Sequence, residues 1–297
     1  MHAILSRCRL APPRLARWLL AGALLNPAAC APAQDGVAAA TPVAPAPAAS
    51  APPLLDPAEV AAEATRLRAA LARAVPQGRP SPERDQAWIA LAQAVLANGG
   101  TAIDRPQLII AVDRNPAVQQ LAILLARPDG AWEVIGGSRV STGQAGRRHY
   151  YITPTGIFPH TDAILDWRAE GTFNENRIRG LGTRGMRVWD FGWVMARKGW
   201  RSDGEEGEIR LLLHATDPDA LEQRLGRTAS QGCVRVPSAM NRFLDLHGVL
   251  DIDHERAAAD DPRFRALLRP DRTPTPLAGR LMVVFDSAAA AAPSPSS

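Results

Sequence analysis

Two stretches near the start of the chain repeat their apolar residues at helical spacing. The first covers residues 56–75, and one face collects its larger apolar side chains: Val60, Ala64, Leu67 and Leu71. Asp56 can cap this helix, and Pro57 suits its first position. The second stretch begins at Ser81-Pro82 and ends at Asn98-Gly99-Gly100, with a stripe of Trp88, Leu91 and Val95. We therefore predict a helical accessory segment over residues 56–105, which we expect to support packing.

The pattern changes at about residue 106, where short apolar runs alternate with turns. Such runs predict strands at 108–112, 118–126, 132–135, 209–213 and 281–285. The turn Arg127-Pro128-Asp129-Gly130 joins two of them. Short helices are expected at 218–225 and 237–246. The sequence thus predicts a mainly β domain, a β-sandwich or meander with short helices, preceded by a short N-terminal helical segment.

Weaker periodicity marks further divisions of the chain. The principal domain is expected at 106–250, with an insertion or lid at about 161–208, where glycine and arginine dominate. Trp167, Trp189, Trp193 and Trp200 lie in that insertion, and we expect most of them to form its core. A C-terminal extension with a helix and a strand follows at 251–287. Residues 288–297 are small and Pro-containing, which predicts a disordered tail.

The N-terminus has the pattern of an export signal. A segment with four arginines and no acidic residue is followed by a short apolar run. Ala31-Pro32-Ala33 then resembles a cleavage site. We therefore expect a signal peptide at 1–33 and a periplasmic location; a buried N-terminal helix is the alternative. Lipid attachment at Cys30 is a second possibility. Residues 34–55 are rich in alanine and proline, which predicts a disordered linker.

The charge balance depends on this leader. The chain has 34 Lys+Arg and 30 Asp+Glu, and cleavage would remove four arginines and no acid, leaving 30 of each. A neutral mature chain gives no reason to expect a nucleic-acid partner. No apolar run approaches the ~20 residues that span a bilayer, so no stable transmembrane span is expected.

Cys233 is the candidate for covalent chemistry. Removal of the leader would leave it as the only cysteine, so it would have no internal disulfide partner. His214 ends the apolar run 209–213, and a histidine beside a thiol can take its proton and form an ion pair with the thiolate. Gly232 would let the chain turn sharply and direct main-chain N–H groups at an oxyanion. A structural cysteine remains the alternative at this point.

Arg235 and four histidines are candidates for supporting roles. Arg235 could reach a substrate carboxylate, or could simply be solvated. His247 and His254 are expected at the surface, whereas His149 and His160 could approach the site. One cysteine and scattered histidines lack the ligand spacing of a structural zinc site, so no metal is expected, and no cofactor motif is present in the sequence.

Three segments together resemble the L,D-transpeptidase catalytic domain. They are Val140-Ser141-Thr142-Gly143, then Thr153-Pro154-Thr155-Gly156-Ile157-Phe158, then His214-Ala215-Thr216 with Ser230-Gln231-Gly232-Cys233-Val234-Arg235. They occur in the family's order over roughly residues 106–250. Two departures stand out: Gln231 replaces a common histidine, and Ala215 replaces a common glycine.

The resemblance implies a peptidoglycan L,D-transpeptidase that forms a thioester and then cross-links stem peptides or attaches an envelope protein. It implies that Cys233 is the nucleophile, that His214 is the general base, and that the oxyanion and substrate-binding set comprises Gly232, Ser230, Arg235, Thr216 and Gln231. Within this set, Ser230 would support the loop and Arg235 would contact substrate. No cofactor is implied. An L,D-carboxypeptidase and a non-catalytic envelope-binding module remain the alternatives.

Overall fold

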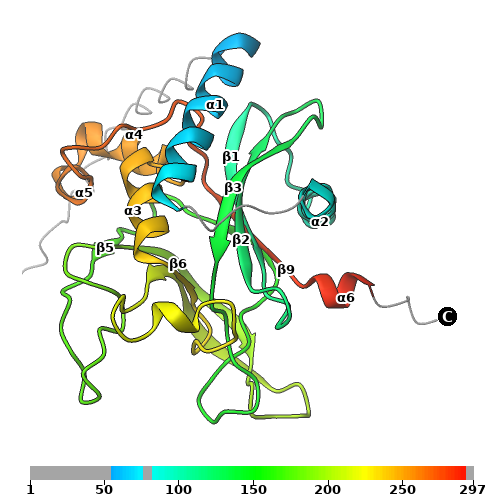
Figure 1. Ribbon diagram of the computed structural model, residues 1–297, viewed down its shortest axis with the longest axis vertical. Helices are drawn as coiled ribbons and strands as arrows, with labels where there is room; N and C mark the ends of the chain where they lie inside the picture. The colour runs from blue at the N-terminus through cyan, green and yellow to red at the C-terminus, as the bar shows by residue number, and fades with distance from the viewer. Residues whose placement is uncertain (1–54, 76–81, 292–297) are drawn as a thin grey trace, which may run out of the picture. The chain divides into compact units, whose positions relative to one another are not determined.

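The computed structural model describes residues 55–75 and 82–291 (Figure 1). The expected signal peptide at 1–33, Cys30 and nearly all of the linker at 34–55 lie outside these residues. Residues 292–297 of the expected tail lie outside them too. No helix within the described ranges combines the length and apolarity needed to cross a membrane.

The two predicted N-terminal helices are confirmed. Helix α1 (Pro57–Ala74) begins with a capping box, in which Asp56 accepts from the Glu59 N–H at 2.8 Å and Glu59 accepts from the Asp56 N–H at 2.9 Å. It buries the expected face. Helix α2 (Pro82–Asn98) buries Trp88, as expected, together with Ile89, Ala92 and Leu96. Leu91 and Val95, which we expected in the same stripe, are only partly buried.

A five-stranded sheet, sheet A, carries the expected meander. Its order is β3-β2-β1-β9-β4, comprising β1 (Gln107–Asp113), β2 (Gln120–Ala126), β3 (Glu133–Arg139), β4 (Gly156–Pro159) and β9 (Leu281–Phe285). Strands β1, β2 and β3 pair antiparallel in sequence order. Strand β9 pairs parallel with β1 and antiparallel with β4, so the expected C-terminal extension supplies an inner strand of this sheet.

A four-stranded sheet, sheet B, has the order β5-β6-β7-β8. It comprises β5 (Trp167–Arg168), β6 (Arg187–Arg197), β7 (Glu206–Ala215) and β8 (Val234–Val236). Strands β6 and β7 pair antiparallel, and β7 and β8 pair parallel. The expected insertion at 161–208 therefore contains β5, the long strand β6 and the start of β7, joined by loops.

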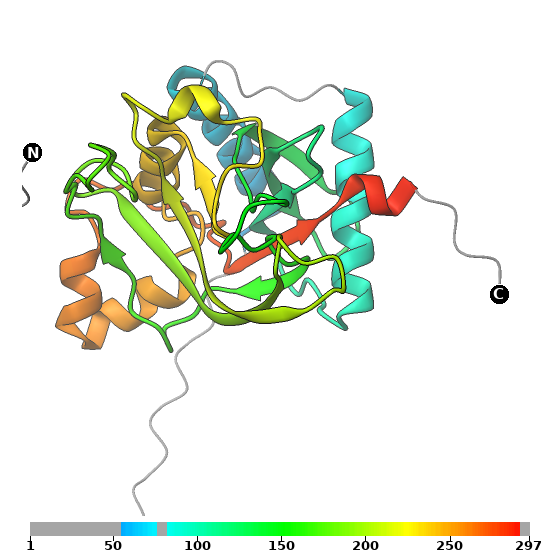
Figure 2. The same ribbon diagram turned by 90° about the horizontal axis from the view of Figure 1, so that it is seen from below.

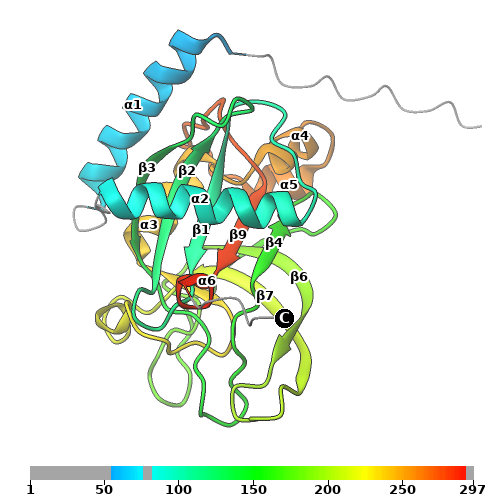
Figure 3. The same cartoon turned by 90° about the vertical axis from the view of Figure 1, so that its right-hand side faces the viewer.

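Apolar side chains join these parts into layers. One hydrophobic cluster combines one face of sheet A, the inner face of sheet B, α1 and α3 (Ser238–His247). A second cluster packs α2 on the other face of sheet A, where the rings of Trp88 and Phe285 meet edge to face at 5.7 Å. Figures 2 and 3 show α2 across that face, on the side of sheet A away from α1 and α3.

The remaining helices differ in part from the sequence prediction. Helix α3 matches the run expected at 237–246. The helix expected at 218–225 is wrong, because only a 3₁₀ turn, η1 (Glu222–Arg224), forms there. Helices α4 (Ile252–Asp260), α5 (Pro262–Leu267) and α6 (Ser287–Ala291) complete the chain. With these helices the architecture is two β-sheets covered by α-helices, more helical than the mainly β class we expected.

Candidate active site

The candidate nucleophile and base lie on one face of sheet B. Leu213 pairs with Val234 and His214 with Arg235, so the same register brings Cys233 opposite Leu212. Side chains alternate between the two faces of a sheet, and Leu213 and Val234 point into the core. Leu212, His214, Cys233 and Arg235 therefore share the opposite face, which we call the outer face.

Both groups are neutral in this structure at neutral pH. Burial, helped by the charge of Arg235, lowers the pKa of His214 to about 4. Burial raises the pKa of the Cys233 thiol, although the Leu212 N–H and Arg235 oppose this rise. These two shifts favour a neutral imidazole and a neutral thiol over the expected imidazolium–thiolate ion pair.

The hydrogen bonds of the two groups define their proton positions. His214 Nδ1 lies 2.6 Å from the Ala215 carbonyl oxygen, which can only accept, so Nδ1 carries the proton and Nε2 has the free lone pair. The Cys233 thiol donates to the Arg210 carbonyl at 3.6 Å. The two side chains do not hydrogen-bond to each other in this conformation. General-base catalysis would require the thiol to turn from the Arg210 carbonyl toward Nε2.

Arg235 is a cation with no carboxylate partner in the described part of the chain. Its Nη1 donates to the Ala229 carbonyl at 3.3 Å, and its Nε is buried without a partner. Burial lowers its pKa, but an arginine still carries its charge at any physiological pH. A half-buried, unpaired guanidinium beside the thiol suits an incoming carboxylate.

Ser230 fixes the turn that precedes Cys233. Its fully buried hydroxyl accepts from the Gly232 N–H at 3.1 Å and donates to the Cys233 carbonyl at 2.6 Å. Gly232 has φ +131°, and an added Cβ would lie 2.6 Å from Ile209. The Gly232 N–H is thus already engaged, so the Cys233 N–H is the candidate main-chain donor to an oxyanion.

Thr153 links the three sequence segments that carry the family resemblance. Its hydroxyl accepts from the Gly143 N–H at 2.8 Å and donates to the Gly232 carbonyl at 2.7 Å, and the side chain is fully buried. Ser141 and Arg235 exchange two main-chain hydrogen bonds. Segments far apart in sequence are therefore hydrogen-bonded around the turn that holds Cys233.

Two expected substrate-binding residues have different environments. Thr216 is 1% exposed and its hydroxyl has no partner among the described residues, so it lies beneath the surface. Gln231 is exposed next to the turn, and its carbonyl accepts from the Tyr151 N–H at 3.3 Å. Gln231 can reach a ligand from solvent, whereas Thr216 in this conformation cannot.

A loop between β5 and β6 packs beside His214. An added Cβ at Gly182 would lie 2.7 Å from the Ala215 side chain, which shows how closely the loop approaches β7. Asp217 accepts from the Arg179 main-chain N–H at 2.7 Å and ties the loop to the residues after His214. The loop also borders a cavity of about 450 Å³, which is lined by residues between Trp167 and Thr172 and by Gly180, Leu181 and Gly182. This part of the expected insertion is therefore packed against the end of β7 that holds His214.

A buried charge cluster was not anticipated from the sequence. Arg187 Nε donates to Asp166 at 2.8 Å, His160 Nε2 lies 3.0 Å from the same oxygen, and Arg187 Nη2 donates to Asp251 at 3.2 Å. Burial alone would raise the pKa of Asp166, but His160 and Arg187 outweigh it and lower the value to about 2. Asp166 also accepts from the Asp190 N–H at 2.9 Å, so the cluster anchors the start of β6 opposite His214.

The same cluster contains the described group best placed to bind a metal ion. Ligand atoms of His160, Asp166 and His254 lie within 4.8 Å of one another. However, the two imidazole rings are stacked at 4.2 Å with planes 4° apart, so their in-plane lone pairs do not converge on one point. Arg187 also occupies the shared Asp166 oxygen. The geometry suits a buried charge network better than a metal centre.

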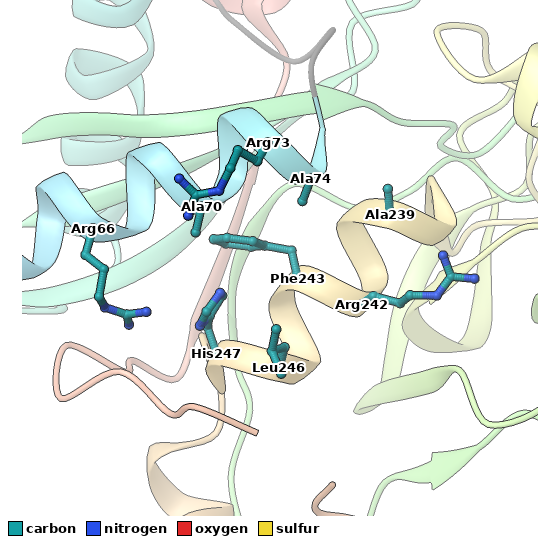
Figure 4. A pocket seen from close by; sticks show the side chains of 9 residues that line it. All are labelled: Arg66, Ala70, Arg73, Ala74, Ala239, Arg242, Phe243, Leu246 and His247. Atoms are coloured by element: carbon teal, nitrogen blue, oxygen red, sulfur yellow. The ribbon is translucent and has the colours of Figure 1, made fainter. Parts of the chain in front are cut away.

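A second pocket lies between α1 and α3 and contains none of the predicted site residues. Its cavity of about 530 Å³ has Phe243 and His247 at its base and three arginines around it (Figure 4). Arg66 is paired with Glu63 at 2.6 Å, and Arg242 points away from Phe243. The guanidinium groups therefore do not converge on a common anion.

Several expectations about single residues are wrong. His247 and His254 are buried, because α3 and α4 turn them into the protein and not toward solvent. We expected most of the four tryptophans to be core, but only Trp189 is fully buried, and Trp193 is 60% exposed. His149 lies beside Trp200 and is exposed, and His160 belongs to the charge cluster.

No protein-family model matches this chain, and no curated protein matches it significantly.

Proposed function

We propose that this chain is a peptidoglycan L,D-transpeptidase with Cys233 as nucleophile and His214 as general base. The observation that carries the proposal is the register of β7 and β8, by which both residues share the outer face of sheet B. Three further features support it: a neutral His214 with a free Nε2, the unpaired Arg235, and the hydrogen-bonded junction of the three family-like segments at Thr153. An L,D-transpeptidase-like fold and a periplasmic location belong to the same proposal.

In the first half-reaction, Cys233 Sγ attacks the carbonyl of the third residue of a tetrapeptide stem. His214 Nε2 takes the thiol proton as the C–S bond forms, and the Cys233 N–H donates to the oxyanion. The tetrahedral intermediate then expels D-alanine, whose nitrogen receives the proton from Nε2. Arg235 would bind a substrate carboxylate during this step. A thioester and a neutral imidazole remain.

In the second half-reaction, an amine from a second stem, or from an envelope protein, attacks the thioester carbonyl. Nε2 takes a proton from this amine and returns it to the departing sulfur, which regenerates the thiol. The product is a new amide bond. Water as the acceptor would instead release a shortened stem.

Product analysis on purified tetrapeptide muropeptides tests this function. We expect cross-linked dimers with the wild-type protein and none with Cys233→Ala, whose circular dichroism should match that of the wild type. Shortened monomers without dimers would identify a carboxypeptidase using the same thiol. Unchanged substrate with folded wild-type protein would refute the proposal.

A further inference from the structure

A β-bulge turns one tryptophan of β6 out of the protein. Trp189 points into the core, and in a regular strand Trp193, four residues later, would point the same way. The register between β6 and β7 shifts between Asp190 and Trp193, where Gly192 has φ +82°. Trp193 then pairs with Arg210, which shares the outer face with Leu212 and His214. The extra residue therefore brings the indole to the face that holds the thiol.

Trp193 is exposed beside a fixed cation. Its side chain is 60% exposed, the largest fraction among the large apolar residues in the described ranges. The Arg210 guanidinium lies over the indole at 5.4 Å from the ring centroid. Asp190, itself buried, holds that guanidinium through Nε at 2.9 Å and Nη2 at 2.6 Å. The flat apolar surface of the indole thus lies beside N–H donors of Arg210 that are already held in place. Ligand binding would not have to immobilise this arginine, which lowers the entropic cost of binding.

These features match one face of a pyranose ring. Such a ring presents C–H groups on its face, which pack on an aromatic side chain, and hydroxyl groups at its edge, which bond to fixed donors. An acidic peptide would be a poorer fit, because Asp190 already neutralises Arg210. A membrane surface would be a poorer fit as well, since the exposed indole adjoins an ion pair.

The distance to Cys233 agrees with the proposed substrate. Trp193 is on β6 and Cys233 immediately precedes β8, with β7 between them. Trp193 is opposite Arg210, and Cys233 is opposite Leu212, two residues further along β7. With strands about 4.8 Å apart and a rise of about 3.3 Å per residue, the two positions are separated by about 12 Å. Three amino acids separate the attacked carbonyl from the sugar in a peptidoglycan stem, and extended residues span about 3.3–3.6 Å each. Three such residues span about 10–11 Å, so the sugar ring at the end of a bound stem would come to the exposed Trp193 indole.

We infer that Trp193 and Arg210 form a sugar subsite that recognises the glycan end of the donor stem. This inference rests on the proposed function, because it assigns the donor as a glycan-linked peptide and not a free one. It predicts a preference for a disaccharide-tetrapeptide over the same tetrapeptide without sugar. The preference would come from binding on the outer face, away from the reacting atoms.

The test compares kcat/KM for the two donors in variants of the folded, full chain. Trp193→Ala should lower kcat/KM for the disaccharide-tetrapeptide by about tenfold, as expected for one lost aromatic contact. For the free tetrapeptide, kcat/KM of this variant should stay within about twofold of the wild-type value. Trp193→Phe keeps an aromatic face and should restore most of the preference. Phe173→Ala is the matched control, because Phe173 is also exposed and stacked on an arginine, Arg179 at 4.2 Å. It should leave the ratio between the donors unchanged.

A second measurement separates failure of this inference from failure of the proposed function. Saturation-transfer NMR with peptide-free glycan chains and the Cys233→Ala protein needs no turnover. We expect a signal that disappears when Trp193→Ala is added. The sugar subsite would be overturned if Trp193→Ala lowered kcat/KM equally for both donors. It would also be overturned if glycan chains still bound to the protein with Trp193→Ala. Absence of turnover of either donor by the wild type would instead count against the transpeptidase.

Discussion

Replacing Thr153 with valine removes one hydroxyl and keeps the shape of the side chain. That hydroxyl accepts from the Gly143 N–H at 2.8 Å and donates to the Gly232 carbonyl at 2.7 Å, in a fully buried position. Valine therefore leaves two buried main-chain groups without partners, and no water can reach them unless the turn opens. Each such group costs roughly 1–3 kcal/mol. Because the two are adjacent and can relax together, we expect a total loss of about 2–4 kcal/mol.

Urea unfolding measures this loss. We expect Thr153→Val to lower the transition midpoint without changing the slope, which would indicate reduced stability and not a different unfolded state. Thr155→Val is the matched control, since Thr155 is exposed two residues away, and its effect should stay within about 0.5 kcal/mol. If Thr153→Val also stayed within that limit, the hydroxyl would not join the segments around Cys233 and our account of that junction would be wrong.

Three further predictions concern the groups around the thiol. Because the pKa of His214 is about 4, the neutral imidazole that can accept a proton predominates above pH 4. We therefore expect kcat/KM for acylation to fall only as the pH drops toward 4. A fall in kcat/KM centred at pH 6.5, the ordinary pKa of histidine, would contradict this prediction. Arg235→Gln removes a charge that lowers the His214 pKa, so the acid limb should move to higher pH, whereas Arg227→Gln, at an exposed position, should leave it in place. Ser230→Ala deletes two hydrogen bonds at the turn and should cost about 1–3 kcal/mol in urea unfolding. Ser238→Ala, which deletes a buried hydroxyl without a partner, should lower the free energy of unfolding far less. Equal losses of stability in the two variants would show that the Ser230 hydrogen bonds do not stabilise the turn.

The hydrophobic pattern predicted strands better than it predicted their partners. The run 281–285 was expected as a strand and is β9, but its apolar residues contain no information about a parallel pairing with β1. Pairing across 170 residues depends on how the whole sheet assembles. For that reason we expected a C-terminal extension with a strand, but not that this strand would be an inner strand of sheet A.

In the candidate site, too, some residues could be predicted from the sequence and others could not. Cys233 and His214 were selected from residue chemistry and the family-like segments, and the register of β7 and β8 now gives them a common face. The cluster of Arg187, Asp166 and Asp251 gave no sequence signal, because charged residues are usually exposed and nothing in their spacing indicates burial together. The outward Trp193 was missed as well, since the bulge that turns it depends on the backbone at Gly192.

The central claim is that the Cys233 sulfur becomes acylated with His214 as its base, and intact-mass spectrometry tests it most directly. Wild-type protein incubated with a carbapenem should gain one adduct per chain. Cys233→Ala should gain none, and His214→Ala should gain it far more slowly than the wild type. An adduct that persists in Cys233→Ala, or a wild-type chain that stays unmodified, would contradict the account.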